Sequence, residues 1–184
     1  GVGLLDNLDH FSTPSIKREN DNIIILGETK GHLCQSIYAY EIFGDIIGLP
    51  PKVDLLMEKK IGDTVRDLVK KIKIDTVHDI SDGGLLIALT EMSIAGNIGF
   101  ELNIKQNNLN NGYLFGEDQG RYIILVEDKN LSKTIEYIKK NKISHSIIGK
   151  SCGKKIKIDK NSEVDIEEIR DLYENWFENY LKVN

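Results

Sequence analysis

The residues whose chemistry stands out lie in one short stretch, His78 to Gly84, which reads HDISDGG. An apolar, β-branched run precedes it and an amphipathic pattern follows it, so the stretch joins a strand to a helix. Asp79 leaves the carboxyl end of that strand, where ligands bind in open α/β sheets. A carboxylate at this place could hold Mg²⁺, which takes one or two carboxylates together with phosphate oxygens and water.

The rest of the stretch has groups that suit a phosphate. Ser81 can offer a hydroxyl to a phosphate or nucleotide, and Asp82 can cap the helix. Gly83 and Gly84 allow close approach to the backbone and leave N–H groups exposed as an anion nest. A plainer interpretation, which residue types alone favour, makes Ser81 or Asp82 an N-cap and the glycines a tight turn. An EF-hand is excluded, because the bidentate Glu that it requires is replaced by Thr90.

Two further glycine-bounded loops carry polar side chains. In residues 27–32, GETKGH, Thr29 and His32 could reach a ligand, although the glycine spacing excludes a Walker A loop. A strand, loop and helix in this order aim N–H groups at an anion, usually phosphate, but a loop that merely closes onto its helix is the simpler account. Residues 114–121, LFGEDQGR, could bind a metal or form a dimer contact, whereas their glycines favour a solvated turn.

Length and composition bound the class of protein. A chain of 184 residues with 40% apolar and 29% charged residues suits one globular domain. The net charge of −5 without a basic stripe argues against nucleic acid, and no apolar run is long enough to cross a membrane. Two cysteines without a CxxC motif argue against a disulfide framework or a zinc site and suit a reducing cytoplasm. The start, GVGLL, resembles a strand cut in mid-course, so we expect residues 1–184 to be one domain of a longer chain, although a processed start would look the same.

The hydrophobic periodicity predicts the elements that position these loops. Strands are predicted at 22–26, 74–80, 99–104, 121–128, 144–151 and 154–159, the last two as a possible hairpin. Helices are predicted at 33–44, 57–73, 83–95, 130–141 and 164–181, with 106–112 as a polar loop. The last helix has an apolar stripe that favours core or a subunit interface, formed by Ile166, Ile169, Leu172 or Tyr173, Trp176 and Tyr180. The irregular alternation predicts an α/β (α+β) fold, a mixed β-sheet covered by helices.

The stretch VHDISDGGLLIALTEMSIAGNIGFEL resembles the C-terminal domain of phosphoribosylformylglycinamidine (FGAM) synthase, an ATP-dependent amidotransferase of purine biosynthesis. That family has a His-Asp-x-Ser-Asp-Gly-Gly-Leu segment and then a helix that ends Glu-Met-x-x-Ala-Gly, matched here from His78 to Gly96. GHLCQSIYAYEIFG with PPKVDL, and LFGEDQGRYIILV, resemble two more family stretches in the same order. The resemblance therefore covers most of the chain up to residue 150.

The resemblance implies the fold of the C-terminal domain in the aminoimidazole ribonucleotide synthetase-like superfamily. It also implies the last of four domains in a cytoplasmic ligase whose catalytic residues lie in earlier domains, so that this domain alone is expected to be inactive. In the long form of the family, the Asp of the segment holds Mg²⁺ at a second, non-catalytic nucleotide site, and the Ser contacts the nucleotide. Carried over, these are Asp79 and Ser81, and we expect ATP or ADP beside Ser81, Asp82, Gly83 and Gly84.

The resemblance also implies partners. These are the remaining domains of the same enzyme, a separate glutaminase subunit and a small bridging subunit, with neither nucleic acid nor a membrane. The alternative is a structural domain that completes the pseudo-dimer of the enzyme and docks the glutaminase without binding nucleotide. Nucleotide binding that depends on Asp79 separates the two hypotheses.

Overall fold

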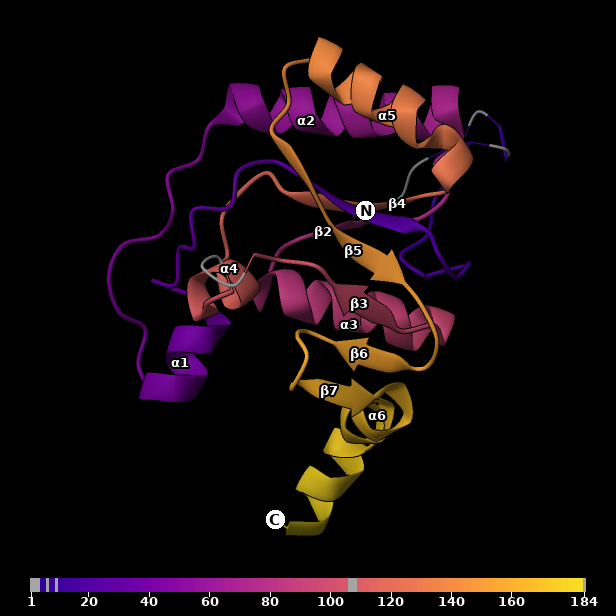
Figure 1. Cartoon of the computed structure of the whole chain (residues 1–184). Helices are drawn as coiled ribbons and strands as arrows, with labels where there is room; N and C mark the ends of the chain where they lie inside the picture. The colour runs from indigo at the N-terminus through magenta and orange to yellow at the C-terminus, as the bar shows by residue number, and fades with distance from the viewer. Residues whose placement is uncertain (1–3, 6, 9, 106–108, 184) are drawn as a thin grey trace.

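The fold is one curled sheet with helices on both faces (Figure 1). The computed structural model describes the whole chain except residues 1–3, 6, 9, 106–108 and 184. Within that part, seven strands lie in the order β2-β4-β1-β5-β3-β6-β7, and each neighbouring pair is antiparallel except β3 and β6. Their bounds are β1 Asn22–Leu26, β2 Val77–Asp79, β3 Phe100–Leu102, β4 Tyr122–Val126, β5 His145–Ser151, β6 Lys155–Lys157 and β7 Glu163–Asp165.

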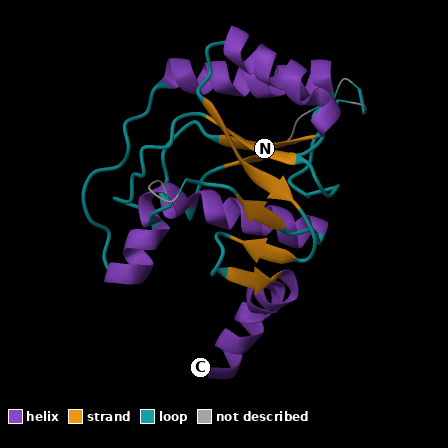
Figure 2. Ribbon diagram, viewed as in Figure 1, coloured by secondary structure: helices purple, strands orange, loops and turns teal. Residues whose placement is uncertain are grey.

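Helices cover the sheet in two layers, one on each face (Figure 2). The helices are α1 Ile37–Phe43, α2 Leu55–Asp67 with the π-helical turn η1 Leu68–Ile72, α3 Gly84–Gly96, α4 Asn111–Phe115, α5 Asp128–Lys140 and α6 Ile166–Val183. Because side chains alternate along a strand, β1 serves both layers. Ile23 and Ile25 pack in the core on the α3 face, whereas Ile24 and Leu26 pack with α2 and α5. Strands β1 and β4 are therefore buried on both faces.

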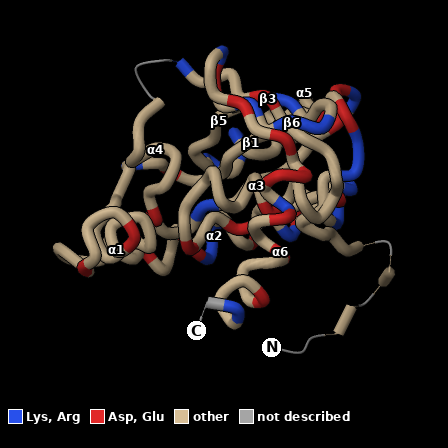
Figure 3. Tube along the Cα trace, turned by 90° about the horizontal axis from the view of Figure 1, so that it is seen from below, with Lys and Arg blue, Asp and Glu red and all other residues tan. Residues whose placement is uncertain are grey.

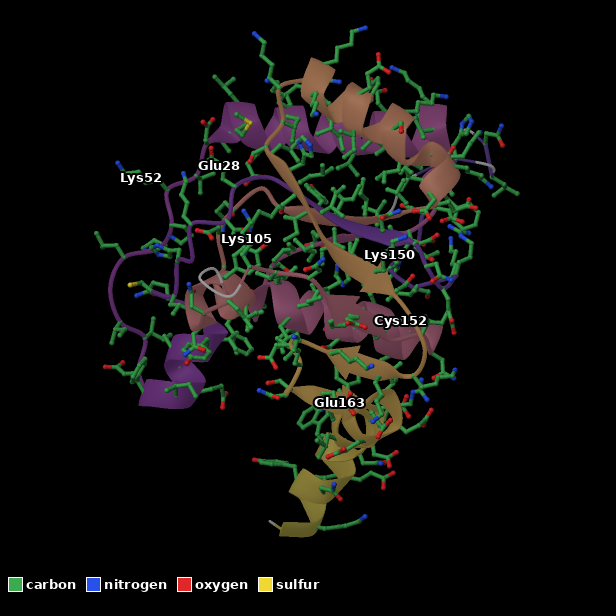
Figure 4. All side chains as sticks on the ribbon, viewed as in Figure 1. Glu28, Lys52, Lys105, Lys150, Cys152 and Glu163 are labelled. Carbon is green, nitrogen blue, oxygen red and sulfur yellow. The ribbon has the colours of Figure 1, made fainter. Side chains whose placement is uncertain are left out.

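The half of the sheet beyond β5 is covered on one face only. Phe100 and Leu102 of β3 point into the core beside α3, while Glu101 between them is exposed. A cavity of about 1000 Å³ lies over this open face, lined mainly by β3, β5 and residues 157–163. The charged side chains of the domain are interspersed in sign, and α1 carries few of them (Figure 3). Figure 4 places Lys150, Cys152 and Glu163 along this side of the sheet.

The predicted hairpin of residues 144–151 and 154–159 is wrong. Strand β3 lies between β5 and β6, and Phe100 is opposite both Ser151 and Ile156. A hairpin would leave the polar backbone of β3 without a ladder on that side, whereas insertion pairs it on both edges. Insertion also brings Ile156 beside Phe100 in the core on α3.

Other predicted elements differ at their ends. The helix predicted from residue 33 begins at Ile37, because Ser36 caps it by accepting a hydrogen bond from the Ala39 N–H. The predicted polar loop 106–112 runs into α4, and its residues 106–108 lie outside the described residues. Neither α4 nor β7 was predicted. No helix in the described part of the chain is long and apolar enough to cross a bilayer.

The segment before β1 is tied to the segment before β2. The guanidinium of Arg18 forms a two-pronged contact with the carboxylate of Asp75, with N–O distances of 2.7 and 2.8 Å. Backbone hydrogen bonds run beside it, from the Thr13 N–H to the Asp75 carbonyl and from the Val77 N–H to the Thr13 carbonyl. Hydrogen bonding to Arg18 lowers the pKa of Asp75 below its ordinary value.

This lowered pKa predicts a pH-dependent stability. The ionised carboxylate of Asp75 stabilises the fold fully above its ordinary pKa of about 3.9, and that stability is lost as pH falls through the lower folded pKa. We expect Asp75→Asn to lower the free energy of unfolding by about 1 kcal/mol at pH 7, with a difference that shrinks below pH ~4. Urea unfolding at several pH values measures it. Asp171→Asn, a substitution at an exposed position on α6, is the control. A free energy of unfolding that depends on pH in the same way for Asp75→Asn and the wild type would contradict the lowered pKa of Asp75.

Candidate functional site

Three loops converge at one edge of the sheet. Tyr122, the first residue of β4, lies opposite both Leu26, the last residue of β1, and Asp79, the last residue of β2. Since β4 is antiparallel to both neighbours, the loop that precedes it meets the loops that follow them. Residues 27–32, 78–84 and 116–121 are therefore brought together, although they are far apart in sequence.

A carboxylate of the chain occupies the N–H groups of the first loop. Asp118 is 6% exposed, and its Oδ2 accepts hydrogen bonds from the backbone N–H of Lys30 and of Gly31, both at 2.8 Å. Its Oδ1 lies 3.4 Å from the His32 nitrogen. The N–H groups of residues 27–32 thus bind an anion, as their geometry predicts, but the anion is Asp118.

The neighbouring carboxylate performs the same task for the second loop. Oε1 of Glu117 accepts hydrogen bonds from the N–H of Gly83 at 2.8 Å and of Ile37 at 2.9 Å. One oxygen therefore lies at the start of both α3 and α1, where a negative charge is favourable. The N–H of Gly84 donates to the Ser81 carbonyl at 3.0 Å. Both glycine N–H groups of the HDISDGG stretch accordingly have acceptors within the chain.

Arg121 joins two of the loops through hydrogen bonds from its guanidinium. Its side chain is 1% exposed, and it donates to the carbonyls of Asp118 and Gly116 and to the hydroxyl of Thr29. Burial lowers the pKa of Arg121, while the charge of Asp118 opposes that shift. The expected solvated turn at residues 114–121 is therefore wrong, because Asp118 and Arg121 are buried and Glu117 is half-buried, each with hydrogen-bond partners inside the chain.

Glycines permit the loops to touch. Gly84 has φ of +76°, and a Cβ there would lie 2.6 Å from the carbonyl carbon of Phe115. Gly27 has φ of +100°, and a Cβ there would lie 2.6 Å from the carbonyl oxygen of Gly120. The glycine at each of these positions is required by the approach of another segment of the same chain.

A small acidic cavity remains between the loops. Its volume is about 200 Å³, and its lining includes Asp79, Ser81 and Asp82 from the predicted site and Glu58 from α2. The carboxylate of Asp79 is 60% exposed, and its Oδ1 lies 3.2 Å from Nδ1 of His78. Nε2 of His78 lies 3.3 Å from Glu91, so the imidazole bridges two carboxylates and orients Asp79. Gly83 and Gly84 are not among the lining residues.

The lining of the cavity offers carboxylates that could hold a hard cation whose other ligands come from elsewhere. These are Asp79, Asp82 and Glu58, whereas Glu117 and Asp118 already accept hydrogen bonds from backbone N–H groups. Among the described residues, no group of three or more His, Cys, Asp or Glu side chains is arranged to hold a metal. Mg²⁺ keeps water or phosphate oxygens beside one or two carboxylates, which suits this donor set.

The fold and the site can now be compared with known proteins. Over residues 18–160 the chain matches the family described as AIR synthase related protein, C-terminal domain. The chain belongs to this family. Structures of the same fold include Thermotoga maritima PurL complexed with FGAR, with a TM-score of 0.69, 17% identity and coverage of 87% of this chain and 29% of that one. The hydrogenase maturation protein HypE is more distant, with a TM-score of 0.51, 16% identity and coverage of 76% and 46%.

Curated relatives are more similar in sequence than these structures. The phosphoribosylformylglycinamidine synthase subunit PurL of Rhodopseudomonas palustris (strain HaA2) is 40% identical over 182 residues, which cover 98% of this chain and 25% of that protein. The subunit PurL of Bartonella tribocorum is 39% identical over 181 residues, with coverage of 98% and 25%. The predicted resemblance and the α/β fold with a mixed sheet are confirmed. The chain spans about a quarter of the length of these relatives.

Three residues of the site were missed by sequence reasoning. Glu117, Asp118 and Arg121 stood in a stretch that was noticed but interpreted as solvated. A signal was present, because Glu-Asp-x-x-Arg directly precedes the apolar strand 122–126, and charged groups so close to a buried strand require internal partners.

The buried carboxylate of Asp118 gives a stability prediction. We expect Asp118→Asn to lower the free energy of unfolding by about 2–3 kcal/mol, because an amide replaces a charged acceptor and faces N–H groups with its own. Urea unfolding followed by circular dichroism measures the change. Asp45→Asn, an exposed residue that accepts one N–H, should change stability by only about 0.5 kcal/mol. An equal, small effect of both substitutions would show that Asp118 does not hold the loop.

Proposed function

We propose that the chain is the C-terminal domain of an FGAM synthase. That enzyme is an ATP-dependent ligase that converts formylglycinamide ribonucleotide, ATP and glutamine-derived ammonia to formylglycinamidine ribonucleotide in purine biosynthesis. The observation that carries the proposal is the 40% identity over 98% of the chain to a protein of that name. Residues 1–184 then form a single domain, the last of four in a cytoplasmic enzyme, and are inactive alone.

The contribution of the domain is one side of a nucleotide site. Asp79 holds Mg²⁺, the hydroxyl of Ser81 donates to a phosphate oxygen, and Asp82, Gly83 and Gly84 form the loop beside the nucleotide. The exposure of Asp79, its orientation by His78 and its place in an acidic cavity support this assignment. When bound, the ion neutralises phosphate charge. Solved relatives of the same fold are described as PurL complexed with ATP, with ADP and with AMPPCP.

The size of the cavity limits what the domain can do by itself. Sites for ligands as large as a nucleotide measure about 300–1000 Å³, which exceeds the cavity of about 200 Å³. The cavity admits an ion and phosphate oxygens, so the base and ribose require a surface outside this domain. Since Glu117 already accepts the Gly83 N–H, a phosphate contacts the Ser81 hydroxyl and not the amide at the start of α3.

A structural domain without nucleotide is the second candidate. One observation favours it, because Glu117 and Asp118 satisfy the N–H groups of both loops without a ligand. In that case the domain completes the pseudo-dimer of the enzyme and docks a glutaminase subunit and a small bridging subunit. The two candidates differ in whether Asp79 binds a metal.

Titration of Mg·ADP into the chain tests the metal role of Asp79. We expect weak binding by calorimetry, and Asp79→Asn should weaken it at least about tenfold, equivalent to ~1.4 kcal/mol. Ser81→Ala should weaken it less, because one neutral hydrogen bond is lost. Asp171→Asn, which removes an exposed charge on α6 outside the lining of the cavity, is the matched control. Binding that is equal in Asp79→Asn and the wild type would exclude Asp79 as the metal ligand.

An exchange of domains tests the activity. The 182 matched residues of Rhodopseudomonas palustris PurL are replaced by this chain, and FGAR-dependent ATP hydrolysis is measured with the other subunits present. We expect activity within about tenfold of the parent, or ~1.4 kcal/mol in transition-state stabilisation. The same exchange with the Bartonella tribocorum segment shows whether the host tolerates a foreign domain. The proposed function would be contradicted if the exchange protein with this chain is soluble but inactive while the one with the Bartonella tribocorum segment is active.

A further inference from the structure

Within the described part of the chain, the hydrogen bonds that tie helix α6 to the rest of the domain come from its beginning. The side chain of Ile166 is buried, and its N–H donates to the Lys154 carbonyl. Arg170 reaches back to the Ile94 carbonyl and to the side chain of Asn97, both at 3.2 Å. From residue 172 onward the helix runs away from the sheet (Figure 1).

The apolar face of α6 continues far beyond this attachment. At about 100° per residue, its later apolar side chains fall within the half of the helix that also contains Ile166 and Ile169. These side chains are 54–66% exposed: Leu172, Tyr173, Trp176, Phe177, Tyr180 and Leu181. An exposed apolar patch of this length on a helix indicates an interaction surface.

The chemistry of the helix defines the surface that it fits. Trp176 and Phe177 form an edge-to-face pair with ring centroids 5.5 Å apart, the type of aromatic group that anchors interfaces. The helix is acidic outside its apolar face, because α6 has five carboxylates and only two basic residues, Arg170 and Lys182, which contact Glu167 at 2.7 Å and Glu178 at 3.8 Å. The complementary surface is therefore a groove with an apolar floor and a basic rim.

The lengths of the sequence matches to the family and to the PurL relatives indicate where in the protein that groove lies. The family match ends at residue 160, before β7 and α6. The PurL relatives match 98% of the chain, which includes at least most of α6, and three quarters of their length lies outside the matched part. Helix α6 thus lies within the match to the long relatives and outside the family match. The exposed apolar residues of segment 37–57 lie within the family match, so no such distinction is available for them.

We propose that residues 172–181 of α6 dock into a groove on the remainder of the longer polypeptide, outside this domain. The helix acts as an anchor that fixes the domain against its neighbours through Trp176 and Phe177. This surface is separate from the cavity at Asp79, and the inference rests on the proposed function only for the choice of host protein.

Hydrogen exchange followed by mass spectrometry tests this docking. Peptides that cover residues 171–183 are compared in the isolated chain and in the Rhodopseudomonas palustris exchange protein. We expect rapid exchange in the isolated chain and exchange slowed at least about tenfold in the long protein, because docking suppresses local opening. Peptides from β1 verify folding in both. Equal exchange in the two proteins would overturn the proposal.

Matched variants make the test specific to one face of α6. Leu172→Glu with Trp176→Glu should abolish the slowing in the exchange protein, whereas Asn175→Glu with Asn179→Glu, on the polar face, should retain it. All four positions are exposed in this domain, so the substitutions leave its core intact. Protection in the isolated chain that rises with concentration would assign the surface to a second copy and overturn the proposal. Protection that requires an added subunit would overturn it as well.

The readout needs no catalysis. An inactive exchange protein in which α6 is protected would contradict the proposed function while supporting the docking of α6. An active exchange protein in which α6 is not protected would support the proposed function and contradict the docking of α6.

Discussion

The structure depends on two adjacent carboxylates that accept hydrogen bonds from backbone N–H groups in distant parts of the chain. Asp118 binds the N–H groups of residues 30 and 31, and Glu117 binds those of Gly83 and Ile37. Loops with unsatisfied N–H groups would otherwise be held apart by the water they require. With the carboxylates in place, and with Arg121 compensating their charge, the three loops pack closely enough to need glycine at their contacts.

This arrangement also explains the character of the candidate site. Because the N–H groups of the loops have acceptors within the chain, the cavity between the loops is lined mainly by acidic and neutral polar side chains. Such a cavity suits a cation better than a bare phosphate. Under the proposed function, a nucleotide would be held through its metal, and the rest of its surface would contact a neighbouring domain.

The sequence predicted what is local and missed what is distant. The strand at residues 22–26 and the end of a helix at residue 44 follow from local patterns, and both are confirmed. Asp79, Ser81 and Asp82 were placed together because they share one loop. Asp118 and its partner Lys30 are 88 residues apart, and no local pattern reports such a contact.

Two errors have the same origin. Adjacency in sequence suggested that β5 and β6 pair. Instead β3 lies between them and pairs with both, which brings Phe100 into the core. The stripe of α6 was correct as a face, yet periodicity does not reveal what covers it. The domain itself covers Ile166 and leaves Trp176 62% exposed.

The single oxygen of Glu117 that serves two helices has a mechanical consequence. Any force that draws the start of α3 toward a ligand must either carry Glu117 along or break its bond to Gly83. In the first case the start of α1 moves as well, because Ile37 donates to the same oxygen. The exposed apolar segment that begins at α1 is thereby coupled, through the side chain of Glu117, to the loop that contains Ser81.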